Sequence, residues 1–120
     1  MSIISKIFIG ILAIEHLYIL WVEMFAWTRK GPKIFKKFSK ELFNQTKEMA
    51  SNMGLYNGFL SAGLLWSLLI TDQIWAKNIS IFFVSCVILA GFYGAITAEK
   101  SIFVKQALPA IITMILIILL

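Results

Sequence analysis

Residues 7–27 read IFIGILAIEHLYILWVEMFAW, a run of apolar side chains interrupted by Glu15, His16 and Glu23. The run lacks the regular polar stripe that the exposed face of a soluble helix carries. It is also about as long as the roughly 20 apolar residues that a helix needs to cross a bilayer. This stretch therefore predicts a membrane-spanning helix over residues 3–27.

The rest of the chain is similarly apolar. Of its 120 residues, 60% are hydrophobic and 14% are charged, which is more apolar surface than a soluble domain of this size can bury. Further apolar segments predict helices over residues 45–70, 78–98 and 102–120. The sequence thus predicts one all-α membrane domain over residues 1–120, folded as a four-helix transmembrane bundle.

Residues 33–43 combine apolar and basic side chains at helical spacing. This pattern predicts a cytoplasmic amphipathic helix that lies in the membrane interface between the first two spans. Seven basic residues surround it: Arg29, Lys30, Lys33, Lys36, Lys37, Lys40 and Lys47. Lys100 and Lys105 flank the last turn on the same side. Only Lys6 and Lys77 lie on the other side, so the positive-inside rule predicts a cell-membrane protein with both termini extracytoplasmic.

The formal charge of +5 could also indicate nucleic-acid binding. Because the basic residues directly follow an apolar span, residues 29–47 suit anionic lipid headgroups better. Cys86 is the only cysteine, which excludes an intrachain disulfide and a cysteine metal motif. We expect membrane lipids as partners, no nucleic acid and no cofactor, and the sequence leaves a homo-oligomer open.

Glu15 and His16 lie near the middle of the first expected span, close to the bilayer midplane. A charged side chain there costs about 2.5–3.5 kcal/mol on insertion scales, so each needs a partner or a wet cavity. His16 and Glu23 share a helix face but differ by a rise of roughly 10 Å, and Glu15 points about 100° away from His16. These three residues are the candidate catalytic or ligand-binding groups, and a network that only locks helix packing is the alternative. One helix with this spacing cannot converge on a metal ion, so no metal site is expected.

Other expected helices offer side chains that could complete the site: Trp27, Asn52, Tyr56, Asn57, Tyr93 and Gln106. Antiparallel packing brings the start of the second helix level with Glu23, where amide and phenol groups could satisfy the carboxylate. Tyr93 is expected to reach the cluster from the third helix, and Gln106 is a candidate near the cytoplasmic end of the fourth. Small residues around Gly91 and Gly94 predict close packing of the third helix.

Several motifs give the chain a family resemblance: Glu15-His16, Glu23-Met24-Phe25-x-Trp27, Leu55-Tyr56-Asn57-Gly58-Phe59-Leu60 with Ala62-Gly63, and Gly91-x-Tyr93-Gly94-Ala95. Together they resemble the bacterial membrane proteins of the domain of unknown function 1304 family, over nearly the whole chain. The resemblance implies a compact protein of four spans. It implies no activity, so function has to be argued from the site.

Three functions fit these features. The first is a protein that binds or transports a small lipophilic or cationic ligand through Glu15, His16 and Glu23, since intramembrane carboxylates commonly do so. The second is a membrane enzyme with isomerase-like acid-base chemistry on a lipid-like substrate, which Asn57 or Tyr93 would polarise. The third is a structural or regulatory subunit. We rank them in this order.

Overall fold

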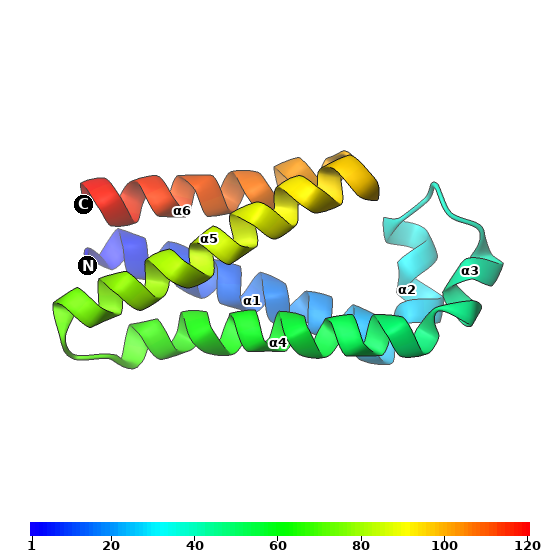
Figure 1. Cartoon of the computed structure of the whole chain (residues 1–120), viewed down its shortest axis with the longest axis horizontal. Coiled ribbons are helices and arrows are strands. Elements are labelled where there is room, and N and C mark those ends of the chain that lie inside the picture. Colours follow the sequence, from blue (N-terminus) through cyan, green and yellow to red (C-terminus); the bar gives the residue numbers. More distant parts are fainter.

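The computed structural model describes all 120 residues, and the chain folds entirely into helices, which confirms the predicted all-α class. The helices are α1 (Ile3–Phe25), α2 (Trp27–Ile34), α3 (Lys40–Gln45), α4 (Lys47–Leu69), α5 (Gln73–Thr97), the π-helical turn η1 (Phe103–Ala107) and α6 (Leu108–Leu119). The long helices run antiparallel to their sequence neighbours (Figure 1). Both termini therefore lie at one end of the molecule, and α2 and α3 lie at the other.

Two of these helices, α1 and α5, are long and apolar enough to cross a membrane. α4 is as long as α1, but its first turns carry polar residues such as Lys47, Glu48 and Asn52. η1 and α6 together form a shorter apolar helix over Phe103–Leu119. The four expected spans thus correspond to four long helical segments, of which two meet the length and hydropathy expected of a span.

Glycines bring α4 into close contact with α1. A Cβ atom on Gly54 would lie 2.6 Å from Met24 Cγ, and one on Gly58 would lie 2.7 Å from Leu20 Cδ1. Farther along, the buried Ser61 hydroxyl donates a hydrogen bond to the Ala13 carbonyl oxygen at 2.8 Å. Both the close approach and this hydrogen bond fix α4 against α1.

The hydrophobic core lies between α1, α4, α5 and α6, and consists of Ile9, Leu12, Ala13, Leu64, Val84, Val87, Ala110 and Ile117. The small residues of α5 pack inside the chain. A Cβ atom on Gly91 would meet the backbone N and Cα of Ala107 at 2.7 and 2.8 Å, and one on Gly94 would lie 3.2 Å from Ile102 Cγ2. This face therefore joins α5 to η1 and is not free to hold a partner protein.

The expected amphipathic helix over residues 33–43 is wrong in detail, because the chain forms α2 and α3 with a non-helical segment between them. Aromatic packing explains the difference. Trp27 packs at a tilted angle against Phe43, with 4.9 Å between ring centroids, and against Phe35, with 5.8 Å. Phe35 and Phe43 thus pack around Trp27, where one continuous helix would have laid them along a membrane surface.

The third long helix begins at Gln73, earlier than the expected residue 78. Asp72 explains the earlier start, since its side chain accepts hydrogen bonds from the backbone N–H groups of Ile74 and Trp75. An Asp in this position satisfies donors that would otherwise lack partners in the first turn.

Gly91→Ala is expected to destabilise the protein by about 1–3 kcal/mol, because the added methyl group forces the backbones of α5 and η1 apart. Thermal unfolding of the purified protein in detergent measures the loss. Gly10→Ala is the control, since no atom lies within 4 Å of a Cβ atom at Gly10. A normal unfolding temperature for Gly91→Ala would contradict the close packing.

Candidate functional site

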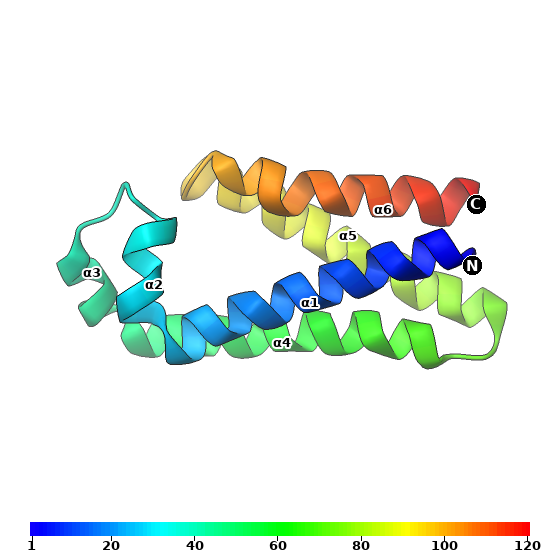
Figure 2. The same cartoon turned by 180° about the vertical axis from the view of Figure 1, so that it is seen from behind.

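His16 lies on the inner face of α1, and it is fully buried. α1 packs between α4 and α6 (Figure 2). His16 Nδ1 lies 2.8 Å from the Leu12 carbonyl oxygen, and His16 Nε2 lies 3.1 Å from Gln106 Nε2. A carbonyl oxygen can only accept, so Nδ1 carries the hydrogen. The Gln106 amide nitrogen can only donate, so Nε2 accepts, and the ring is the neutral Nδ1–H tautomer.

The π-helical turn η1 positions Gln106. Its wider winding ends with a hydrogen bond from the Leu108 N–H to the Phe103 carbonyl oxygen, five residues earlier. Pro109 follows at the start of α6 and has no N–H to continue a regular ladder. Single π-helical turns of this kind are frequent at functional sites. Here the turn places the Gln106 amide within hydrogen-bond distance of the imidazole.

Glu23 is the second buried polar group of α1, and its side chain is 6% exposed. Asn57 Nδ2 donates a hydrogen bond to Glu23 Oε1 at 2.6 Å, and it also lies 3.1 Å from the Met53 carbonyl oxygen. The structure thus brings together Glu23 and Asn57, two residues that the sequence predicted at one level.

Asn52 and Tyr56 do not join this contact. Asn52 is exposed, and its amide donates to the Glu48 carbonyl oxygen on its own helix. Tyr56 is 62% exposed. Of the three polar residues expected near Glu23 from the second long helix, only Asn57 contacts it.

Glu15 differs from His16 and Glu23, because one oxygen of its carboxyl group has no hydrogen-bond partner. Its side chain is partly buried, and Oε1 is buried without any hydrogen-bond partner. The three polar groups of α1 are therefore not one cluster. His16 and Glu23 each have a partner on another helix, whereas Glu15 has none.

Trp27 and Tyr93 lie away from these groups. Trp27 Nε1 donates a hydrogen bond to Thr46 Oγ1 at 3.0 Å and belongs to the aromatic packing of α2 and α3. Tyr93 is 71% exposed, so the expectation that it reaches the polar groups is wrong. The Gly91 face of α5 meets η1, and two residues farther along a helix a side chain points about 200° away from that face.

Sequence reasoning missed two interhelical groups, Ser61 and Thr46. Ser61 could have been found, since a hydroxyl beside Ala62 and Gly63 in an apolar helix is a common interhelical hydrogen-bonding group. The Thr46 contact depends on the tertiary position of Trp27, which no local pattern gives.

No three His, Cys, Asp or Glu side chains converge as metal ligands. Neither of the two main surface cavities is lined by Glu15, His16 or Glu23.

The fold and these residues define a small, all-helical protein with buried polar pairs between apolar helices. The family described as "Protein of unknown function (DUF1304)" matches residues 10–118, and the chain belongs to that family, as its motifs predicted. The chain is similar to the uncharacterized protein YpaA of Lactococcus lactis subsp. lactis (strain IL1403). The two are 28% identical over 118 residues, which make up 96% of this chain and 97% of that protein. No solved structure matches this chain.

Asn57→Ala is expected to cost about 1–3 kcal/mol of stability, because it leaves the buried Glu23 carboxyl without a donor. Asn52→Ala removes an exposed amide of the same type from the same helix and should change stability by less than about 0.5 kcal/mol. Thermal unfolding of both variants in one detergent compares them. Equal stabilities would show that the Glu23–Asn57 contact does not hold α1 and α4 together.

Proposed function

We propose that this chain is a multi-pass membrane protein in which α1, α4, α5 and the η1–α6 segment all cross the bilayer. Low burial of the apolar helices supports this. Only 28% of the most apolar stretch of α1 and 22% of that of α5 are buried within the protein. A core helix of a soluble protein would be mostly buried, whereas a spanning helix turns its apolar surface toward lipid.

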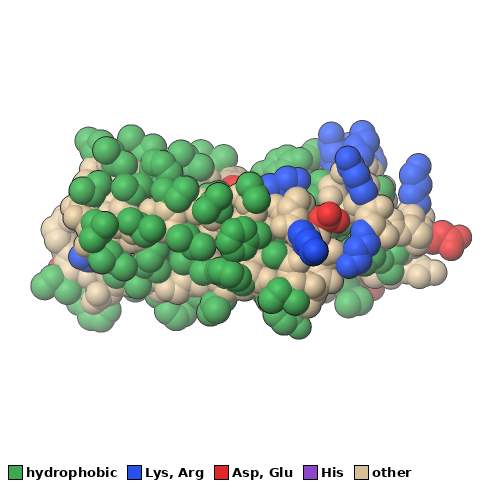
Figure 3. Space-filling model, turned by 90° about the horizontal axis from the view of Figure 1, so that it is seen from above, with side chains coloured by type: hydrophobic (Ala, Val, Ile, Leu, Met, Phe, Trp, Pro, Cys, Tyr) green, Lys and Arg blue, Asp and Glu red, His purple; other side chains and the backbone are tan.

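The surface of the molecule supports the same placement. Hydrophobic side chains cover most of the length of the protein, and Lys and Arg gather at the end that α2 and α3 form (Figure 3). The longest dimension is 47 Å, while the hydrocarbon layer is about 30 Å thick. The bundle would lie in that layer, and the basic end would extend beyond it.

The basic end is proposed to face the cytoplasm, with both termini outside. Nine Lys and Arg residues lie toward that end, against two toward the termini. Basic residues in short loops are retained on the cytoplasmic side.

Cysteine labelling in intact cells tests this orientation in a Cys86→Ser background. A membrane-impermeant maleimide is expected to label Thr71→Cys, in the exposed turn before α5, but not Ser39→Cys, in the exposed segment before α3. Lysing the cells should expose both positions. The reverse labelling pattern would overturn the orientation. Labelling of both positions or of neither position in intact cells would overturn the proposed spans, since both positions would then lie on one side of the membrane.

Within this membrane protein, we infer that Glu15 binds a small lipophilic cation, which the protein holds or transports. The observation that supports this is the buried Glu15 Oε1 atom without a hydrogen-bond partner. A buried acceptor of this kind needs a donor, and an ammonium group supplies both the N–H and the opposite charge. His16 and Glu23 already have partners, so Glu15 is the group left for a ligand.

The lipophilic part of the ligand follows from the surroundings of Glu15 on α1. Ile11 and Tyr18 lie one turn before and after it and are 50% and 51% exposed. A ligand bound to Glu15 would pack against these side chains. The acid-base enzyme hypothesis has less support, because its proposed polarising residues lie elsewhere: Asn57 is bound to Glu23, and Tyr93 is exposed.

Phenethylamine, a protonated lipophilic amine, is expected to raise the unfolding temperature of the detergent-solubilised protein in a saturable way. Ethylbenzene lacks the amine and should have no such effect. Glu15→Gln should abolish the response, because it removes the negative charge that the ammonium binds. Glu48→Gln neutralises an exposed carboxylate and should respond as wild type does. The proposal fails if phenethylamine stabilises Glu15→Gln as much as wild type, or stabilises neither protein.

A further inference from the structure

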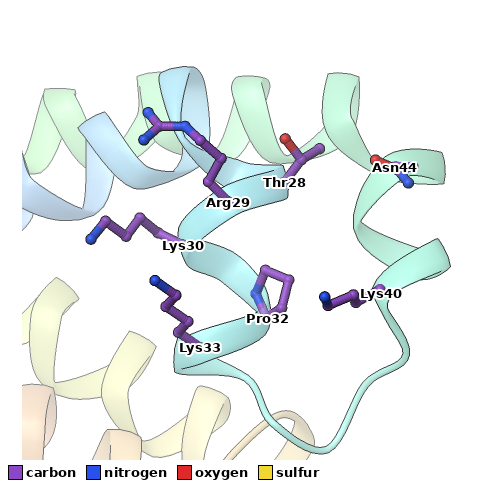
Figure 4. A pocket seen from close by; sticks show the side chains of 7 residues that line it. All are labelled: Thr28, Arg29, Lys30, Pro32, Lys33, Lys40 and Asn44. Carbon is purple, nitrogen blue, oxygen red and sulfur yellow. The ribbon is translucent and has the colours of Figure 1, made fainter.

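A surface cavity of about 470 Å³ lies between α2 and α3, at the basic end of the molecule (Figure 4). Its lining residues are Thr28, Arg29, Lys30, Pro32, Lys33, Lys40 and Asn44. Four of these side chains are cationic, none is acidic, and the two remaining polar ones carry a hydroxyl and an amide. The volume falls within the roughly 300–1,000 Å³ of small-molecule sites.

The second surface cavity has a different character. Its lining includes Glu99 together with Lys37 and Lys100, and half of its lining residues are hydrophobic. A carboxylate there offsets part of the positive charge. The cavity between α2 and α3 has no such acidic group, so it is the stronger anion site.

The two helices that carry the cationic side chains are held together by packing that does not involve their charges. Gly31 lies so close to Phe43 that a Cβ atom would be 2.6 Å from its ring, and Trp27 hydrogen-bonds to Thr46. These contacts fix α2 against the α3 segment. Lys30 and Lys33 lie one turn apart on α2 and extend in the same direction, while Lys40 extends from α3 toward Pro32.

Like charges that line one cavity repel one another, and no acidic side chain in the lining offsets the repulsion. An anion in the cavity would do so. A phosphate monoester carries a charge of about −1.5 to −2 at neutral pH and offers three acceptor oxygens. Arg29 can donate in a bidentate manner, and the Thr28 hydroxyl and the Asn44 amide add neutral donors.

We propose that this cavity binds a phosphate monoester, presented by a membrane lipid such as phosphatidic acid. The inference rests on the membrane placement proposed above, which puts the end of α1 and the cavity beside it at the level of the lipid headgroups. It is independent of the Glu15 site. A phosphodiester headgroup such as that of phosphatidylglycerol carries one charge and is expected to bind more weakly.

The test uses the full-length protein in neutral detergent, titrated with dioctanoyl phosphatidic acid, dioctanoyl phosphatidylglycerol or glycerol 3-phosphate. Native mass spectrometry gives the bound fraction of each. Wild type is expected to bind phosphatidic acid most tightly. Lys33→Gln/Lys40→Gln should weaken that binding about 25-fold, because each cation removed near a phosphate costs about fivefold.

The matched control is Lys36→Gln/Lys47→Gln, which removes two exposed lysines from the same basic segment but outside the cavity. It should bind phosphatidic acid within about threefold of wild type, since exposed charges farther from the phosphate are screened. Equal losses in the two double variants would overturn the proposal in favour of diffuse attraction to the whole segment. No preference for phosphatidic acid over phosphatidylglycerol would overturn the monoester assignment.

The soluble probe distinguishes the source of the phosphate. If glycerol 3-phosphate binds as tightly as phosphatidic acid and is lost in Lys33→Gln/Lys40→Gln, a phosphate site exists but a lipid is not its ligand. Thr28→Val provides a second variant that keeps all charges, and it should weaken phosphatidic acid binding severalfold. Folding is checked without ligand, where Lys33→Gln/Lys40→Gln is expected to unfold at or above the wild-type temperature because repulsion is removed. If the phosphate proposal fails, the phenethylamine response that depends on Glu15 is still expected.

Discussion

Three buried polar side chains, His16, Glu23 and Ser61, find hydrogen-bond partners across the contacts between α1 and its neighbours. An unsatisfied buried group costs about 1–3 kcal/mol. Two of the contacts join α1 to α4: the Ala13 carbonyl with Ser61, and Glu23 with Asn57. A third joins His16 of α1 to the η1–α6 segment. Apolar surfaces alone would let long helices slide along one another, whereas these contacts are satisfied in one register only. The arrangement of the bundle therefore depends on them.

The distribution of charge separates the molecule into two parts. The acidic groups of α1 lie among apolar helices, and most basic groups lie on α2, α3 and their connecting segment. Trp27 links the two parts, because it follows α1 directly and packs against Phe43. The end of α1 thus fixes both the level of Glu23 and the position of the basic cavity.

The sequence predicted those features that depend on local pattern and on antiparallel order. The length of the apolar runs predicted the long helices. The antiparallel direction of the helices predicted that Asn57 lies level with Glu23. The features that it did not predict depend on tertiary packing. The local pattern is compatible with Phe35 facing lipid, but in the structure Phe35 packs against Trp27. Tyr93 belongs to the same small-residue motif as Gly91. However, Gly91 lies on the face of α5 that meets η1, whereas Tyr93 is exposed. The π-helical turn, which places Gln106, has no local signature beyond Pro109.

A network that only locks helix packing explains two of the three polar groups on α1. His16 and Glu23 are buried, and each forms a hydrogen bond to another helix. Glu15 does not fit that explanation, because its buried oxygen contacts no donor. For packing alone, a leucine of similar size would fill the space without an unmatched acceptor, and such replacements of unsatisfied buried groups are neutral or stabilising. This contrast is the reason that we propose a ligand for Glu15, and a cation with an apolar body would satisfy both its charge and its surroundings.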